Sequence, residues 1–177
     1  LVCWPWLVTY YFVLPPGGTS TVLLHTTFDN PAAISSPRAG LGGTSPLATS
    51  DFVTGRTNSA ANFSPGASPK FARFPVANGT ETNIELDKGE IEFWFRPNYS
   101  TTGDDAQHVL LVAGNIYNAP RLQIVESDRL SFSLLDRDFN SYTAQSEYHQ
   151  PLFEPGQWVQ LRAVWDNSDA NDSVRLF

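Results

Sequence analysis

The chain has 177 residues and a mass of 19.6 kDa, which is the size of a single domain. It is 41% hydrophobic and 16% charged, with 12 Gly and 13 Pro, and this mixture favours strands joined by irregular loops over a helical bundle. The formal net charge is -7 and the 11 Lys and Arg residues are scattered, which argues against a nucleic-acid or other polyanionic partner.

The first 20 residues are predicted to be a hydrophobic segment followed by a linker. Residues 1–14 are apolar but too few to span a bilayer, which takes about 20 residues. The segment is typical of the rear of a secretory signal or of a longer anchor, yet it lacks a basic leader and a clear cleavage site. Three interpretations therefore stay open: a signal, an anchor or neither. Cys3 is the sole cysteine, which leaves no internal disulfide and no thiolate metal cluster. The folded domain is expected to span residues 21–177.

Short runs rich in apolar, aromatic and Thr residues predict strands along this domain. The first strand is expected to end at Asp29-Asn30-Pro31, and residues 32–57 read as a long surface loop with one short strand at 51–53. Further strands are predicted at 59–64, 70–76, 90–97, 108–114, 121–127, 129–136, 141–148, 157–165 and 173–177. None of the longer runs has the spacing of an amphipathic helix.

Apolar residues alternate with polar ones in three of these runs, as half-buried antiparallel strands require. The residues expected to point inward are Ile91, Phe93, Phe95, Leu130, Phe132, Leu134, Val159, Leu161 and Ala163. Glu92, Arg96 and Arg162 are expected to point outward. The run 108–114 is apolar on both sides, which suits a central strand. Together these patterns predict an all-β domain of two antiparallel sheets packed face to face.

Several pieces of the sequence resemble, in this order, a laminin-G-like domain of the concanavalin A-like lectin/glucanase superfamily. They are FDN, ANFSPG, KFARFPV, GEIEFWFRP, RLQIVESDRLSFSL and EPGQWVQLRAVWDNSDANDSVRLF. The most specific are Phe95-Arg96-Pro97 and the stretch from Gly156-Gln157-Trp158 to Val164-Trp165-Asp166. The resemblance covers about residues 21–177 and implies a jelly-roll β-sandwich that binds carbohydrate or protein, as part of a larger secreted or cell-surface chain.

The family pattern continues past the strand that matches residues 173–177, and its last strand lies beside its first. Here the sequence stops at Phe177, so we expect an incomplete sandwich with an open edge at the first strand, around residues 22–28. Alternatively, residues 4–14 could fold back as a substitute strand between Pro5 and Pro15.

Glu85, Asp87 and Glu90 fit the spacing of the carboxylates of laminarinase-type glycosidases in the same superfamily. That chemistry needs both carboxylates on one face of a continuous strand, about 5–5.5 Å apart for retention. Asp87-Lys88-Gly89 has turn chemistry and is expected to interrupt the strand before Glu90. We therefore predict no catalytic residues, and the pair Glu90 and Glu92 reads as the outer face of a sheet.

Calcium is the one cofactor that the sequence suggests, because Asp and Asn cluster in loops and hard cations take oxygen ligands. Asp29 is the best single candidate, since the resemblance implies a ligand at the end of the first strand. The alternative is that these residues end strands by bonding the local backbone. The three histidines, His25, His108 and His149, lie in no metal-binding spacing.

A sugar site needs aromatic faces with hydrogen-bonding groups around them. The candidates in the middle region are Tyr117, Arg121, Asp138, Tyr142 and Tyr148. The alternative is that the tyrosines pack on the sheet with wet hydroxyls.

The sequence therefore predicts a non-catalytic binding module of an exported or cell-surface protein, recognising carbohydrate or a protein surface. Two other functions stay open: a glycoside hydrolase or polysaccharide lyase, and a structural or adhesive spacer. No nucleic-acid partner is expected, and membrane contact only through an N-terminal anchor.

Overall fold

The computed structural model describes residues 6–13, 22–63, 70–99, 107–114, 121–126, 129–136, 138–147, 153–166 and 173–177, with the backbone alone for 6–13 and Arg121. The first half holds β1 (Trp6–Val13), β2 (Val22–Thr26), α1 (Pro31–Ser35), the 3-10 helix η1 (Thr49–Asp51), β3 (Phe52–Thr54), β4 (Ser59–Ala61), β5 (Ala77–Asn78), β6 (Glu81–Thr82) and β7 (Lys88–Arg96). The second half holds β8 (His108–Gly114), β9 (Arg121–Glu126), β10 (Leu130–Leu135), β11 (Ser141–Gln145), β12 (Val159–Asp166) and β13 (Ser173–Leu176).

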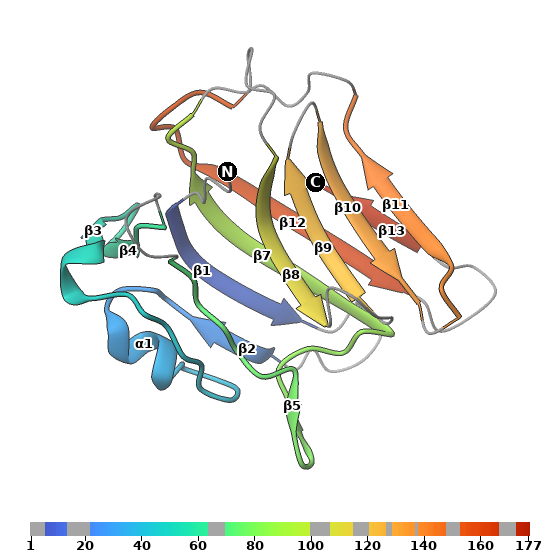
Figure 1. Cartoon of the computed structure of the whole chain (residues 1–177), viewed down its shortest axis with the longest axis horizontal. Coiled ribbons are helices and arrows are strands. Elements are labelled where there is room, and N and C mark those ends of the chain that lie inside the picture. The colour runs from blue at the N-terminus through green and yellow to red at the C-terminus, as the bar shows by residue number, and fades with distance from the viewer. Residues whose placement is uncertain are drawn as a thin grey trace.

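The strands form two main sheets and one small hairpin, and the domain is all-β with antiparallel pairing throughout the described strands. The larger sheet has the order β13-β12-β7-β1-β4-β3, with β2 also paired to β1. The smaller sheet has the order β11-β10-β9-β8, and β5 pairs with β6. Figure 1 shows the smaller sheet lying over β7, β12 and β13. No helix in the described ranges is long and apolar enough to cross a membrane.

The predicted inner faces of the two sheets meet in one hydrophobic core. Eight of the nine residues predicted to point inward are buried, namely Ile91, Phe93, Phe95, Leu130, Phe132, Leu134, Leu161 and Ala163, and only Val159 is half-buried. Phe132 of the smaller sheet meets Trp165 of the larger one, with ring centroids 6.1 Å apart. Arg162 is exposed on the opposite face of β12, while Glu92 and Arg96 are half-buried. Period two thus assigned the faces of β7, β10 and β12 correctly.

Gly89 and Trp165 are cross-strand partners on the inner face of the larger sheet. The indole of Trp165 covers Gly89 so closely that a Cβ there would lie 2.6 Å from Cζ2. The Trp165 Nε1–H donates to the carbonyl of Glu85 at 3.1 Å, which fixes the ring above the start of β7. Glycine is therefore required here for close packing, and β7 begins at Lys88. The predicted interruption between Asp87 and Glu90 was wrong in position, because the turn precedes Lys88.

Strand β1 lies in the middle of the larger sheet, between β7 and β2. It pairs with β7 from Trp6↔Arg96 to Val13↔Glu90, and with β2 from Tyr10↔Thr26 to Val13↔Val22. β1 belongs to the segment that was expected to precede the domain, and the structure instead gives it the place considered for a substitute strand. β2 is therefore paired along the edge that was expected to be open.

Three other local expectations differ from the structure. The segment 70–76 is not a strand, since its one bridge is Thr44↔Arg73, and it is a loop that packs against the core with Phe74 edge-on to Phe28. β8 is an edge strand of the smaller sheet rather than a central one. The loop 32–57 overlaps a short helix, α1, which begins where Asn30 accepts a hydrogen bond from the Ala33 N–H at 3.1 Å.

Replacing Gly89 with Ala should lower the free energy of unfolding by about 1–3 kcal/mol, because the added methyl group overpacks the core against the indole. Urea denaturation of both proteins measures the difference. In a Trp165→Phe background the clash is removed, so Gly89→Ala should cost much less there. An equal cost in both backgrounds would contradict the proposed contact.

Replacing Tyr10 with Pro should destabilise the domain by at least about 1–3 kcal/mol, because Tyr10 is paired on both sides and Pro removes its N–H from the ladder. Tyr10→Val keeps the N–H and is the matched control. Thermal unfolding followed by circular dichroism compares the two variants. If both melt with the parent protein, β1 is not part of the cooperative fold.

Candidate functional site

Two regions carry polar and aromatic side chains that could meet a ligand: the turn between β10 and β11, and the outer face of β7 and β12. Of the five residues predicted for sugar binding, Tyr117 and Tyr148 lie outside the described residues. The backbone of Arg121 pairs with Leu135, which in turn pairs with Ser141. The structure therefore brings the backbone of Arg121 to the end of the smaller sheet where Asp138 and Tyr142 lie.

The turn between β10 and β11 is organised by the carboxylate of Asp136. Its Oδ1 accepts hydrogen bonds from the backbone N–H groups of Asp138 at 2.9 Å and Asn140 at 2.8 Å. Its Oδ2 accepts from Asn140 Nδ2 at 2.9 Å and from the Tyr142 hydroxyl at 3.4 Å. These bonds, first of all that from the Asn140 side chain, lower the pKa of Asp136 below its ordinary value. An ionised, buried carboxylate thus holds the turn in one shape.

Phe139 sits at the tip of this turn with a positive φ of 65°. Non-glycine residues seldom adopt this conformation, and it persists only where the surroundings enforce it. The side chain is 67% exposed and is flanked by exposed Asp138 and Asn140. An aromatic ring is therefore presented to solvent on a fixed backbone, next to two polar side chains.

Tyr142 does not offer its ring in the same way. It is half-buried and packs against the hydrophobic core, and its hydroxyl bonds Asp136. The exposed aromatic residue of this turn is Phe139, which the sequence analysis missed. The signal was present in Asp136-Arg137-Asp138-Phe139-Asn140, where Asp and Asn at turn positions enclose a Phe that has no inward-facing place in a strand.

The outer face of β7 and β12 holds the carboxylates that were considered for catalysis. Two residues along a strand are about 6.6 Å apart, close to the 6.5–9.5 Å of inverting glycosidases, so spacing alone does not exclude Glu90 and Glu92. However, Arg162 donates to both oxygens of Glu90, at 2.8 and 2.7 Å, and Gln160 donates to Glu92 at 2.7 Å. The bond to Glu90 also raises the pKa of the Arg162 guanidinium.

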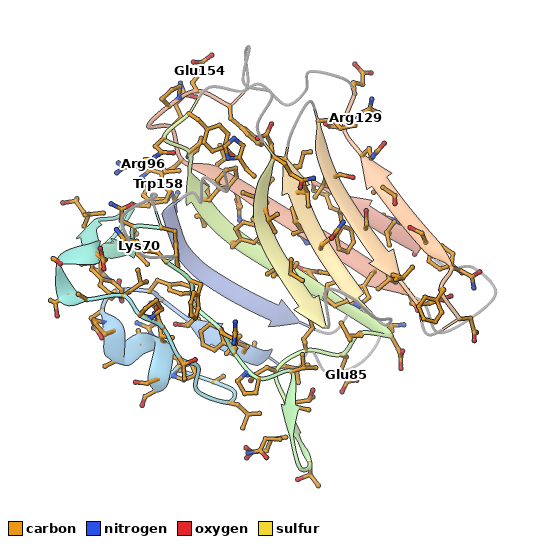
Figure 2. The ribbon with its side chains drawn as sticks, in the orientation of Figure 1. Lys70, Glu85, Arg96, Arg129, Glu154 and Trp158 are labelled. Carbon is orange, nitrogen blue, oxygen red and sulfur yellow. The ribbon has the colours of Figure 1, made fainter. Side chains whose placement is uncertain are left out.

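The other members of the glycosidase-like pattern, Glu85 and Asp87, lie outside the strand that carries Glu90. Both precede β7, and Figure 2 shows Glu85 at the opposite end of that strand from Arg96. The three carboxylates of the pattern therefore do not lie on one continuous strand.

The same outer face carries two tryptophans, each covered by an arginine. The guanidinium of Arg56 lies 3.9 Å from the ring centroid of Trp94, and that of Arg96 lies 5.2 Å from that of Trp158. Figure 2 shows Arg96 and Trp158 together where β7 ends and β12 begins. These cation–π contacts give the face two planar, half-buried aromatic groups with charged partners.

Asp29, the candidate calcium ligand, makes a structural contact. Its Oδ1 accepts a hydrogen bond from the Ser59 N–H at 3.3 Å, which joins the segment after β2 to the start of β4. Within the described ranges, no group of three or more His, Cys, Asp or Glu side chains is arranged to hold a metal ion. The calcium site stays a prediction.

His108 and Glu126 face each other across β8 and β9 in the interior, with Nε2 and Oε2 3.9 Å apart. The ring of Tyr99 stacks on the imidazole with centroids 3.6 Å apart. Both ionisable side chains are almost fully buried, so this pair is part of the packing rather than of a surface site.

No protein-family model, curated protein or solved structure matches the chain. The resemblance to laminin-G-like domains therefore stays a prediction, and function must be argued from the geometry of the site.

Acid should loosen the β10–β11 turn. Because the folded state lowers the pKa of Asp136, its ionised form stabilises the turn above the ordinary Asp pKa of about 3.9, and this is lost as pH falls through the lowered value. Hydrogen exchange of the Asp138 and Asn140 amides, followed by NMR, should show protection that declines only below that range. Asp136→Asn should remove this pH dependence. Unchanged protection of both amides in that variant would contradict the role of the carboxylate.

Proposed function

We propose that the chain is a non-catalytic carbohydrate-binding module of an exported or cell-surface protein, with a laminin-G-like jelly-roll sandwich as its fold. The observation that carries this proposal is Phe139, held at the tip of a fixed turn between Asp138 and Asn140. A sugar ring stacks its C–H face on an aromatic ring while its hydroxyls bond polar groups at the rim. Phe139 and its two neighbours supply both elements.

The isolation of Phe139 favours a sugar over a large apolar partner. The other exposed large hydrophobic residues in the described ranges are Val22, Val76, Val112 and Phe177, and none belongs to the β10–β11 turn. A stable protein interface needs a buried apolar core of many residues, whereas one sugar unit needs one ring and a few hydrogen bonds. The carboxylates of Asp136 and Asp138 also disfavour insertion of this tip into a membrane.

The polar groups beside Phe139 indicate what the sugar must offer. Asp138 presents a carboxylate, which only accepts hydrogen bonds, and the amide nitrogen of Asn140 is already bonded to Asp136. The site is therefore rich in acceptors, and its ligand should be a sugar with unsubstituted hydroxyls that can donate. O-methylation of those hydroxyls should abolish the bonds.

A catalytic role has less support. Glu90 and Glu92 are held by Arg162 and Gln160, and the carboxylate of Asp136 in the Phe139 turn accepts hydrogen bonds from Asn140 and Tyr142. Hydrolysis of a glycosidic bond needs two carboxyl groups on opposite sides of the scissile bond. Binding without cleavage is the simpler reading of both regions.

A protein ligand is a second candidate, and the paired Trp and Arg residues of the outer face favour it. Trp and Arg are enriched among residues that dominate binding energy at protein interfaces. Trp94 with Arg56 and Trp158 with Arg96 form such a group on one face of the larger sheet. Substitutions in the two regions therefore distinguish the ligand classes: loss of binding at the β10–β11 turn indicates a sugar, and loss at the outer face of β7 and β12 indicates a protein.

Screening the purified chain on an array of neutral and acidic glycans, followed by calorimetric titration of the best ligand, tests the proposal. Phe139→Ser should weaken binding by about tenfold, since an aromatic contact is worth about 0.5–1.5 kcal/mol beyond the area it buries. Phe177→Ser is the matched control, because Phe177 is 63% exposed and lies beyond β13 on the other sheet.

Three results would count against the proposal: no glycan bound, equal loss in both variants, or loss caused only by Trp94→Ala or Trp158→Ala. The last would move the binding surface to the outer face of the larger sheet. Cleavage of a bound glycan would favour the hydrolase alternative.

A further inference from the structure

The hairpin formed by β5 and β6 is small and exposed. Its two pairs are Ala77↔Thr82 and Asn78↔Glu81, and Gly79 and Thr80 form the loop. Figure 1 shows the hairpin projecting from the body of the domain. Gly79 has a φ of 63°, and no atom lies within 4 Å of the position that its Cβ would take. A hairpin of only two pairs, with three of its four paired residues exposed, is marginally stable by itself, so it opens at low cost.

Asn78-Gly79 is the only Asn-Gly pair in the sequence. Asn78 and Gly79 are both exposed. Because glycine has no side chain, nothing hinders approach of its backbone nitrogen to the side-chain amide of the preceding Asn. Opening of the hairpin frees Asn78 from the extended conformation that separates these two groups.

We propose that Asn78 is a site of spontaneous covalent modification, converted through a cyclic imide to aspartate and isoaspartate. The Gly79 nitrogen loses its proton to solvent hydroxide and attacks Asn78 Cγ. The new N–Cγ bond forms as the Cγ–Nδ2 bond breaks, and the leaving nitrogen takes up protons from solvent and departs as ammonia. Water then opens the five-membered ring. Cleavage of the N–Cγ bond gives aspartate, and cleavage of the bond to the main-chain carbonyl carbon gives isoaspartate. The net reaction consumes one water and releases one ammonia.

Both products should disrupt the hairpin and leave the body intact. A carboxylate at position 78 faces that of Glu81 directly across the strands, and like charges in this position are destabilising. Isoaspartate also lengthens the backbone at position 78, directly next to the two-residue loop. Below the hairpin, the Asn83 N–H bonds the Val76 carbonyl at 2.8 Å, so the change should stop there.

Asn83 is the internal control for this reaction. It is 2% exposed, its Oδ1 accepts from the Leu41 N–H at 2.6 Å, and its Nδ2 donates to the carbonyls of Leu41 and Pro75 at 3.0 and 2.9 Å. Both asparagines lie in the tryptic segment between Arg73 and Lys88, so one peptide reports on both.

The test is incubation of the intact chain in mildly alkaline buffer at physiological temperature, with peptide mapping by tandem mass spectrometry over time. Position 78 should gain the mass that replacement of NH2 by OH gives, more than about tenfold faster than position 83, because Asn83 is buried and is followed by Ile84 instead of a glycine. Protein isoaspartyl methyltransferase should label the product, and hydroxylamine should cleave the imide between residues 78 and 79. Asn78→Gln should show neither signal.

The isolated peptide of residues 74–88 gives the reference rate for an open hairpin. A native rate within a few tens-fold of the peptide rate supports easy opening. Conversion of the peptide without conversion of the intact chain would overturn the inference, because the hairpin would then protect Asn78. Equal rates at positions 78 and 83 of the intact chain would overturn it as well.

Discussion

The larger sheet is continuous only because β1 bonds to strands on both of its sides. It pairs with β7 over seven positions in one direction and with β2 and β4 in the other. Without it, β13-β12-β7 would end at β7, and β2 would have no strand partner in the described part of the chain. Removal of this central strand would leave two rows of backbone groups without hydrogen-bond partners. Assembly of the domain therefore depends on the apolar segment that forms β1.

The sequence predicted well which face of a sheet each side chain lies on, but it predicted poorly which strands lie next to each other. Alternation assigns a side chain to one face from local pattern alone, and this is why the inner residues of β7, β10 and β12 were correct. Neighbours depend on pairing between distant segments, which local pattern does not contain. The run of β8 is apolar whether the strand is central or at an edge, and residues 70–76 alternate like a strand but pack Phe74 onto Phe28 as a loop. The start of β7 was misplaced because Gly89 is a turn residue by type but is required here beneath Trp165.

The candidate site shows the same division between residue type and environment. Asp138 and Tyr142 were selected because acidic and aromatic residues near loops suit sugar binding, and the structure brings both to one turn. The sequence could not show that Tyr142 is packed inward while Phe139 is exposed, since this depends on a positive φ enforced by Asp136. On the other sheet, the sequence could not show that Glu90 is held in an ion pair, because its partner Arg162 lies 72 residues away along the chain.

Two turns built from similar residues have opposite properties, and the reason lies in where their side-chain groups bond. In the β10–β11 turn, Asn140 gives its Nδ2 to the Asp136 carboxylate and its backbone N–H to the same group. This fixes the backbone and keeps the amide occupied, which suits a surface that must hold Phe139 in one position. In the β5–β6 hairpin, Asn78 is exposed on a strand of two residues beside an unhindered Gly79. Asn and Asp favour turns by type alone, but satisfied hydrogen bonds decide whether such a turn is a rigid platform or a point of chemical change.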